Sequence, residues 1–347
     1  MKPFARGLVV GKFSPLHRGH ELVIRTALEQ CERVYVLSYS RPELPGCDPE
    51  RRSHWLLALF PEVRSLVLTD ALLREQAHPE LPEQLPHNDA PDLEHRRFVA
   101  AACRVFFATH VDAVFTSESY GPGFAEELTR YFRTTEPGAA AVRHVAVDPE
   151  RRRVPISGTA LRAGCARADD FLAPIVRASF VRRVLLLGGE SSGKSTLARS
   201  LAQRFETELV AEYGRELWEA RDGQLVYEDL LEIGREQIAR EERALLTAQR
   251  FLFCDTSPLT TLFYCLDLFG RAEPELMAAA TRGYDFIVLC APDIPFEQDG
   301  TRRDAAFRAQ QHAWYLAEIE RRGTPWLLVQ GDDPARVEQV VSRLLPT

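Results

Sequence analysis

The sequence lacks the features that mark secreted, membrane-bound and disulfide-stabilised proteins. Its seven cysteines are scattered and never form a CxxC pair, so neither a disulfide framework nor a thiolate zinc site is expected. No run approaches the ~18 consecutive apolar residues of a membrane span. The first residues, MKPFARGLVVGKF, contain no apolar segment followed by a cleavage site. We therefore expect a cytoplasmic protein without a membrane partner.

An excess of basic residues is also missing. The 43 Lys and Arg residues against 50 Asp and Glu residues leave a formal charge of −7, which is atypical of a general nucleic-acid-binding protein. The 45% of hydrophobic residues excludes a disordered chain. A length of 347 residues corresponds to about two domains. We expect two domains and no nucleic-acid partner.

Short apolar runs alternate with helical segments along the whole chain, which predicts α/β domains with parallel sheets. The predicted strands are 7–10, 34–38, 63–68, 111–116, 142–147, 183–187, 251–254, 286–290 and 326–329. The pattern restarts near residue 183, so we predict domains at 1–175 and 180–347. Residues 71–92 are polar and Pro-rich and are predicted to form an extended surface loop, either a tolerated insertion or a cover for substrate.

A phosphate-binding loop is predicted in the second half. Residues 188–195, GGESSGKS, match GxxxxGK[ST] between an apolar strand and a helical segment. Backbone N–H groups of such a loop cradle nucleotide phosphates, Lys194 reaches the β- and γ-oxygens, and the Ser195 hydroxyl binds Mg²⁺. The nucleotide-binding residues expected here are Gly188, Gly189, Glu190, Ser191, Ser192, Gly193, Ser195 and Thr196.

Charged residues that follow neighbouring strands are the candidates for the rest of this site. Asp255 ends an apolar run and would either bind Mg²⁺ or accept a proton from an attacking hydroxyl; a simple helix cap is the structural alternative. Arg302, within 299–303 (DGTRR), would neutralise the transferring phosphate, although an exposed basic turn explains it too. The predicted substrate-binding residues are Glu212, Tyr213, Arg215 and Arg302.

The first half contains two further candidate anion sites. Residues 11–20, GKFSPLHRGH, follow the first strand and place His17 and His20 at a helix start. No third metal ligand lies at a familiar spacing, so contact with phosphate is a simpler interpretation than metal binding. Residues 156–162, ISGTALR, form a Ser/Gly/Thr turn before a helix that carries Arg162. Alone this turn is a helix cap, but paired with the histidines it would bind a triphosphate.

In combination these motifs resemble those of a known family. GKFSPLHRGH and ISGTALR look like the HxGH and ISxTxxR signatures of the nucleotidyltransferase superfamily, which has a Rossmann-like fold. With LGGESSGKST, AEYGR, CDT (254–256) and DGTR (299–302) in the same order, the chain resembles the bifunctional NadR family over nearly its whole length. The resemblance implies an N-terminal nicotinamide-mononucleotide adenylyltransferase joined to a C-terminal P-loop ribosylnicotinamide kinase.

The resemblance also implies residue roles and substrates. His17, His20 and Arg162 would catalyse adenylyl transfer, and Lys194 and Asp255 the kinase reaction, with Ser195 and Asp255 at the metal. The remaining nucleotide contacts of the first domain would be Gly11, Lys12, Phe13, Ser117, Glu118, Ser157 and Thr159. The expected small molecules are ATP as co-substrate, Mg²⁺, nicotinamide riboside, nicotinamide mononucleotide and NAD. The oligomeric state, including a homo-oligomer, is open.

Two departures from the family pattern affect these expectations. The first strand begins by residue 7, which leaves no room for the helix-turn-helix domain of some members, so DNA-dependent regulation is not expected. Residues 86–92 contain no tryptophan to stack on nicotinamide, so the pyridine preference stays open. The alternatives are a nucleotidyltransferase-kinase fusion acting on another phosphorylated metabolite and an NAD- or ATP-sensing regulator with little turnover.

Overall fold

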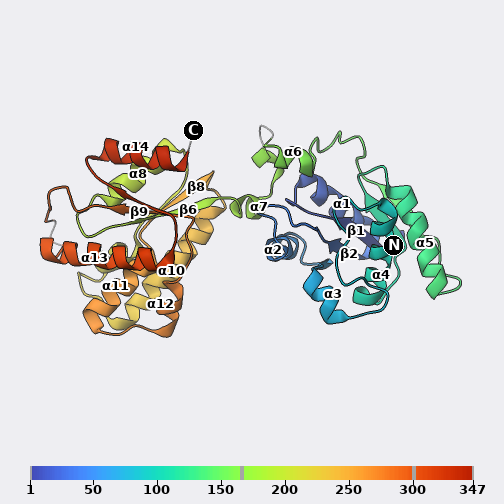
Figure 1. Cartoon of the computed structure of the whole chain (residues 1–347), viewed down its shortest axis with the longest axis horizontal. Coiled ribbons are helices and arrows are strands. Elements are labelled where there is room, and N and C mark those ends of the chain that lie inside the picture. Colours follow the sequence, from blue (N-terminus) through green and yellow to red (C-terminus); the bar gives the residue numbers. More distant parts are fainter. Residues whose placement is uncertain (1, 165–167, 299–301, 346–347) are drawn as a thin grey trace. The chain divides into compact units, whose positions relative to one another are not determined.

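A computed structural model describes residues 2–164, 168–298 and 302–345 (Figure 1). The chain divides into two compact units, Met1–Ser179 and Phe180–Thr347. The predicted domain limits, 175 and 180, lie beside this division. Within the described residues, none of the helices combines the length and apolarity that a bilayer span requires.

The first unit is a five-stranded parallel sheet with helices on both faces. Its strand order is β3-β2-β1-β4-β5. The strands are β1 (Phe4–Gly11), β2 (Cys31–Ser38), β3 (Arg64–Val67), β4 (Ala113–Thr116) and β5 (Arg143–Ala146). The helices are α1 (Arg18–Gln30), α2 (Pro49–Leu59), α3 (Asp70–Gln76), α4 (Asp92–Phe107), α5 (Gly121–Thr135), α6 (Gly158–Arg162), α7 (Pro174–Ala178) and the 3₁₀ turn η1 (Ala168–Phe171). The strand order reverses beside β1, where such sheets bind ligands at their carboxyl edge.

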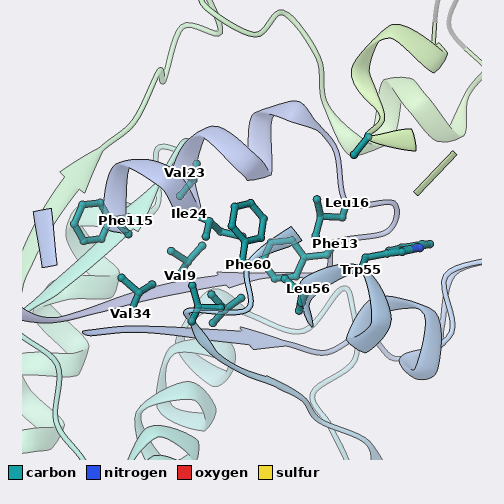
Figure 2. Close-up of a cluster of buried hydrophobic side chains, with 14 of the residues drawn as sticks. Val9, Phe13, Leu16, Val23, Ile24, Val34, Trp55, Leu56, Phe60 and Phe115 are labelled. Carbon is teal, nitrogen blue, oxygen red and sulfur yellow. The ribbon is translucent and has the colours of Figure 1, made fainter. Parts of the chain in front are cut away.

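Packing on both faces of β1 fixes the loop that follows it. Val9 packs on one face with side chains of α1 and α2, and Leu8 on the other face with side chains of α4 and α5. Figure 2 shows the first cluster, in which Phe13 and Leu16 of the loop after β1 are buried. Each such side chain contributes ~1.5–3 kcal/mol by its burial. The loop is therefore anchored by its apolar residues, which leaves its polar groups at the sheet edge.

The second unit is also a parallel sheet, with strand order β10-β9-β6-β8-β7. The strands are β6 (Arg182–Leu187), β7 (Leu209–Val210), β8 (Phe251–Asp255), β9 (Phe286–Cys290) and β10 (Trp326–Val329). The helices are α8 (Lys194–Arg204), α9 (Tyr213–Ala220), α10 (Tyr227–Leu245), α11 (Pro258–Phe269), α12 (Pro274–Ala279), α13 (Ala305–Arg322) and α14 (Asp333–Leu344). The two parallel sheets confirm the predicted α/β class.

One predicted segment differs from the structure. Residues 71–92 were expected to form a surface loop, but α3 occupies the first part of that range. The Thr69 side chain caps α3 by accepting a hydrogen bond from the Leu72 backbone N–H at 3.2 Å, and Leu73 is buried. Leu85 is also buried in the core. The threonine cap and the apolar pair Leu72–Leu73 are local helix signals that the abundance of proline outweighed in the prediction.

Candidate active sites

The two predicted catalytic histidines, His17 and His20, lie at the N-terminus of α1. His17 is the N-cap residue, and its Nδ1 accepts a hydrogen bond from the Gly19 backbone N–H at 3.1 Å. The Nδ1 of His20 accepts from the His17 backbone N–H at 3.4 Å. The two rings stack with centroids 3.7 Å apart. Because each Nδ1 is an acceptor, the hydrogen-bond pattern assigns the proton of each neutral ring to Nε2, which becomes a donor.

Burial keeps both rings neutral at pH 7. Burial, followed by the nearby charges of Arg151 and Arg162, lowers the pKa of His17 to about 4. Burial and the neighbouring His17 lower the pKa of His20 well below its usual range. Phe13 packs edge-on against His20, with centroids 4.9 Å apart, and its own ring is 1% exposed. The Phe13 ring therefore supports His20, and its contact with nucleotide stays a prediction.

The lowered pKa of His17 predicts that the protein loses stability in mild acid. A ring with a pKa of about 4 when folded and 6.5 when unfolded contributes ~3 kcal/mol above pH 6.5. That contribution disappears as the pH falls from 6.5 to 4, because the unfolded state binds the proton first. We expect His17→Asn, which keeps a capping side chain, to reduce the fall in Tm between pH 7 and 4.5. The exposed His54 offers a control: His54→Asn leaves the parental fall unchanged.

Arg162 brings the two first-half motifs together across 148 positions of sequence. Ser157 caps α6 by accepting a hydrogen bond from the Ala160 backbone N–H at 3.1 Å. Arg162, one turn later, donates to the Ser14 carbonyl at 2.7 Å and to Thr159 Oγ1 at 3.3 Å. The helix start of α6 and the loop after β1 therefore face the same space, as two ends of a polyphosphate require.

Every predicted site residue of the first unit lines one cavity of ≈ 320 Å³. These residues are Gly11, Lys12, Phe13, His17, His20, Ser117, Glu118, Ser157, Thr159 and Arg162. Two further residues line the same cavity: Tyr120, which sequence reasoning missed, and Arg151, whose arginine-rich run favours a solvated turn over contact with ATP. Arg151 forms an ion pair with Glu118 at 2.7 Å. Its position in a run of three arginines favoured a solvated turn, and the sequence did not indicate that its side chain faces the cavity.

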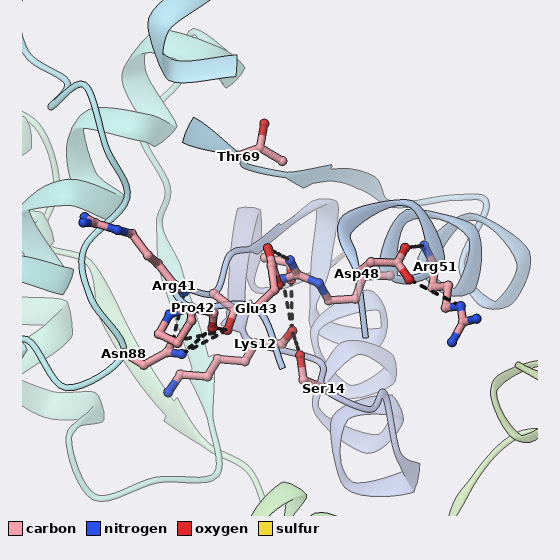
Figure 3. Close-up of polar contacts among 12 residues, drawn as sticks. Lys12, Ser14, Arg41, Pro42, Glu43, Asp48, Arg51, Thr69 and Asn88 are labelled. Atoms are coloured by element: carbon pink, nitrogen blue, oxygen red, sulfur yellow. Dashed lines mark hydrogen bonds and ion pairs between the residues drawn. The ribbon is translucent and has the colours of Figure 1, made fainter. Parts of the chain in front are cut away.

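A buried arginine holds the backbone of the first phosphate loop, in which Figure 3 labels Lys12 and Ser14. Arg52 of α2 is 0% exposed and donates to the Lys12 carbonyl at 3.3 Å and to Ser38 Oγ at 2.8 Å. Its charge is balanced by Glu43 at 2.6 Å. The Ser14 hydroxyl donates to the same carbonyl at 3.0 Å. Burial and the charge of Arg162 lower the pKa of Lys12 itself, and no sequence signal identified Arg52.

The predicted P-loop connects β6 to α8 in the second unit. Gly188 has φ 150°, and a Cβ there would lie 2.6 Å from Ser192 Oγ, so only glycine fits. Lys194 Nζ donates to the Gly189 carbonyl at 3.0 Å. Behind the loop, the buried Arg336 of α14 donates to the Ser192 carbonyl. The loop backbone is thus fixed from behind, and its N–H groups are presented at the start of α8.

Two candidate carboxylates, Asp255 and Glu212, lie at the ends of the paired strands β8 and β7. Asp255 at the end of β8 is 4% exposed, and its Oδ1 is buried without a hydrogen-bond partner among the described residues. Burial and the charge of Asp255 raise the pKa of Glu212. The described residues contain no cluster of three His, Cys, Asp or Glu ligands. A single carboxylate with the Ser195 hydroxyl nevertheless fits Mg²⁺, which takes its other ligands from water and phosphate.

Most predicted residues of the second unit line one cavity of ≈ 360 Å³. They are Gly188, Glu190, Ser191, Ser192, Gly193, Lys194, Ser195, Thr196, Glu212, Arg215 and Arg302. Gly189 packs against Arg308 instead, and the buried Asp255 is not among the residues that line the cavity. Asp299 of the DGTR motif lies outside the described residues. Arg302 donates to Ser191 Oγ at 3.2 Å, which places it at the phosphate loop.

Tyr213 departs from the prediction that it binds substrate. Its hydroxyl donates to Glu232 at 3.0 Å, and Arg240 lies 4.5 Å above its ring. Both partners belong to α10, so the side chain lines a different surface cavity. Tyr213 is the first residue of α9, and the packing of α9 on α10 turns it away from the P-loop. The sequence motif AEYGR did not indicate the orientation of the Tyr213 side chain.

An apolar end of the second cavity was not predicted. Its side chains are Trp218, Leu225, Leu230, Ile233, Tyr264, Leu268 and Tyr315. The Tyr264 hydroxyl donates to Glu190 Oε1 at 3.0 Å, which joins this apolar end to the P-loop. The cavity therefore combines a phosphate cradle with a surface suited to a planar organic group. These residues come from separate helices, and spacing in the sequence did not connect them.

Comparisons with known proteins cover both units. A family model described as "AAA domain" matches residues 183–336. The trifunctional NAD biosynthesis/regulator protein NadR of Escherichia coli (strain K12) is 29% identical over 319 residues, which is 85% of this chain and 71% of that protein. The protein of the same description from Salmonella typhimurium (strain LT2) is 29% identical over 314 residues, with the same coverage.

Two crystal structures of NadR share the fold of the whole chain. The NadR protein in complex with NR has a TM-score of 0.68 at 20% identity, covering 99% of this chain and 96% of that one. The NadR protein in complex with NAD and AMP-PNP has a TM-score of 0.66 at 19% identity, with the same coverage. The resemblance that the motifs indicated is therefore confirmed: this chain is similar to NadR in sequence and in fold across both of its units.

Proposed function

We propose that this chain converts nicotinamide riboside to NAD in two ATP-dependent steps, one in each unit. The second unit phosphorylates the riboside to nicotinamide mononucleotide. The first unit transfers an adenylyl group from ATP to the mononucleotide and releases pyrophosphate. The observation that carries the proposal is that one chain contains two separate phosphate cradles, each at a strand-to-helix turn. The similarity to NadR, including structures with NR, NAD and AMP-PNP, supports the choice of substrates.

In the kinase step the nucleophile is the neutral 5′-hydroxyl of ribose, which must lose its proton as the γ-phosphoryl group arrives. We assign proton acceptance to Glu212 or Asp255. Glu212 lines the cavity, and its raised pKa favours acceptance of a proton. Lys194 and Arg302 would neutralise charge on the transferring group. Mg²⁺, held through Ser195 and Asp255, would supply charge neutralisation at the β- and γ-phosphates.

In the adenylyl-transfer step the nucleophile is a phosphate oxygen of the mononucleotide, which is already anionic. A general base is therefore unnecessary, and catalysis depends on positioning and charge neutralisation. His17 and His20 would donate from Nε2 to the triphosphate, while Arg162 and Lys12 supply positive charge. Because both rings are neutral without ligand, they bind phosphate as hydrogen-bond donors, and a bound phosphate favours their protonation.

The experiment that tests the proposal supplies purified protein with ATP, Mg²⁺ and nicotinamide riboside. We expect nicotinamide mononucleotide to appear first and NAD to follow, with one ADP and one pyrophosphate formed per NAD. Supplying the mononucleotide directly should yield NAD without ADP. ADP formed only with another acceptor would instead identify a fusion enzyme for a different phosphorylated metabolite. Binding of NAD and ATP without any turnover would identify a sensor.

A further inference from the structure

A second cavity of ≈ 190 Å³ in the first unit adjoins the histidine cavity. The two cavities share the lining residues Val10, Gly11, Lys12 and Tyr120. The other walls of the smaller cavity are Tyr39, Asp92, His95, Arg96, Val99 and Phe124. A substrate whose phosphate binds beside Lys12 would therefore have room for its other end in this cavity.

The walls of this smaller cavity are aromatic and held in place. The hydroxyl of Tyr39 lies 2.9 Å from the Nδ1 of His95, and their rings stack with centroids 5.8 Å apart. Phe98 packs edge-on against Tyr39 from behind. Flat, fixed aromatic faces of this kind bind planar rings. The aromatic surface thus comes from the end of β2 and from α4, and not from residues 86–92.

An ion pair forms the polar part of the same cavity. Asp92, the first residue of α4, contacts Arg96 at 2.8 Å, and both side chains line the cavity. The Nε of Arg96 is buried and has no hydrogen-bond partner among the described residues. Gly123 makes room for the guanidinium, since a Cβ there would lie 2.7 Å from Arg96 Nη1. The arginine is therefore closely packed, yet its donors are not all used by the protein.

The segment that leads into Asp92 is pinned to a neighbouring loop (Figure 3). The Asn88 backbone N–H donates to the Arg41 carbonyl at 2.7 Å, and Asn88 Nδ2 donates to the Pro42 carbonyl at 2.8 Å. Arg41 Nη1 in turn donates to the Leu85 carbonyl at 2.8 Å. These bonds fix the start of α4 before a ligand arrives, which reduces the entropy lost on binding.

We propose that the Asp92–Arg96 pair makes the first unit select a pyridine ring that carries a carboxamide over one that carries a carboxylate; this rests on the proposed adenylyltransferase function. A carboxamide has one donor and one acceptor group, which match the Asp92 carboxylate and the Arg96 guanidinium. A ring carboxylate has acceptors only and meets the negative charge of Asp92. The nicotinamide ring of the mononucleotide is also cationic, whereas the nicotinate ring is neutral overall, so Asp92 favours the former.

The test compares kcat/KM for adenylyl transfer to nicotinamide mononucleotide and to nicotinate mononucleotide. We expect the parent protein to prefer the former, and Asp92→Asn to lower that preference about tenfold by removing the repulsive charge. Arg96→Gln should weaken use of both substrates without lowering the preference, because Asp92 stays charged. The effects should appear mainly in KM, since the pair is remote from the reacting phosphorus. The matched control is Asp89→Asn, whose side chain is 89% exposed and outside the cavity; it should keep the parental preference.

Both variants break the same ion pair, so a purely structural role would move the preference in the same direction in each. That result, or an unchanged preference in Asp92→Asn, overturns the inference. Near-UV circular dichroism measures the folding of each variant, because the kinase activity of the second unit reports on that unit alone. Failure of the parent protein to adenylylate either mononucleotide would disprove the proposed function itself, and the inference with it.

Discussion

Replacing Lys194 with alanine is expected to lower the kcat of riboside phosphorylation by about 10³-fold while adenylyl transfer to nicotinamide mononucleotide stays close to the parental rate. Lys194 lies in the P-loop and donates to the Gly189 carbonyl in this structure, so its ammonium is positioned at the loop that would cradle the phosphates. The alanine variant removes that charge without touching the first unit. Separate coupled assays for ADP and for NAD measure the two rates.

The small number of lysines in the chain allows an independent test of this prediction. Only three lysines are present, Lys2, Lys12 and Lys194, and two of them lie one in each phosphate loop. Bound ATP should protect Lys12 and Lys194 from an amine-modifying reagent, whereas the exposed Lys2 reacts equally with and without nucleotide. Mass spectrometry of the modified peptides measures the extent of modification at all three lysines. Loss of both enzymatic activities in a folded Lys194→Ala protein would contradict the division into two sites.

Replacing His20 should have the reverse effect. We expect His20→Ala to reduce adenylyl transfer by about 10²-fold or more, because it removes the donor that we propose for the triphosphate, and to leave riboside kinase activity unchanged. His20 also accepts the hydrogen bond from the His17 backbone N–H, so alanine disturbs the start of α1 as well. The same two assays, with near-UV circular dichroism to monitor packing, give the result.

An asparagine at this position separates catalysis from capping. Its side-chain oxygen replaces the Nδ1 acceptor of His20 but provides no donor at the position of Nε2. If the donor matters, His20→Asn loses adenylyl transfer as His20→Ala does, while regaining thermal stability. Recovery of activity together with stability would show that His20 acts only through the helix cap.

Much of the fold could be predicted because local signals agreed with it. The runs 286–290 and 326–329 coincide with β9 and β10, since buried parallel strands are continuous apolar segments that the hydrophobic pattern marks directly. The P-loop could also be predicted, because its glycines are required by a backbone turn that lies within eight consecutive residues. The start of α3 was missed where proline-rich composition masked a threonine cap.

The orientation of side chains was harder to predict than the position of strands, helices and loops. Tyr213 belongs to a motif that predicts substrate contact, yet α10 draws its ring to another surface. Arg151 stands in a run of three arginines, which is typical of a solvated turn, yet it lines the first cavity. Buried Arg52 and Arg336 support the two phosphate loops from remote helices, and nothing in their local sequence marks them. Each outcome depends on which helices pack together.

The sequence by itself determined the order of strands and helices, the two strand-to-helix phosphate loops and the likeness to NadR, because these depend on short-range patterns of apolar, glycine and capping residues. The tertiary structure decided which distant residues share a cavity: Arg162 with Ser14, and Tyr39 with the Asp92–Arg96 pair. Such contacts follow from strand order and helix packing. These bring together residues that are far apart in the sequence, and nothing in the sequence near either residue indicates the contact.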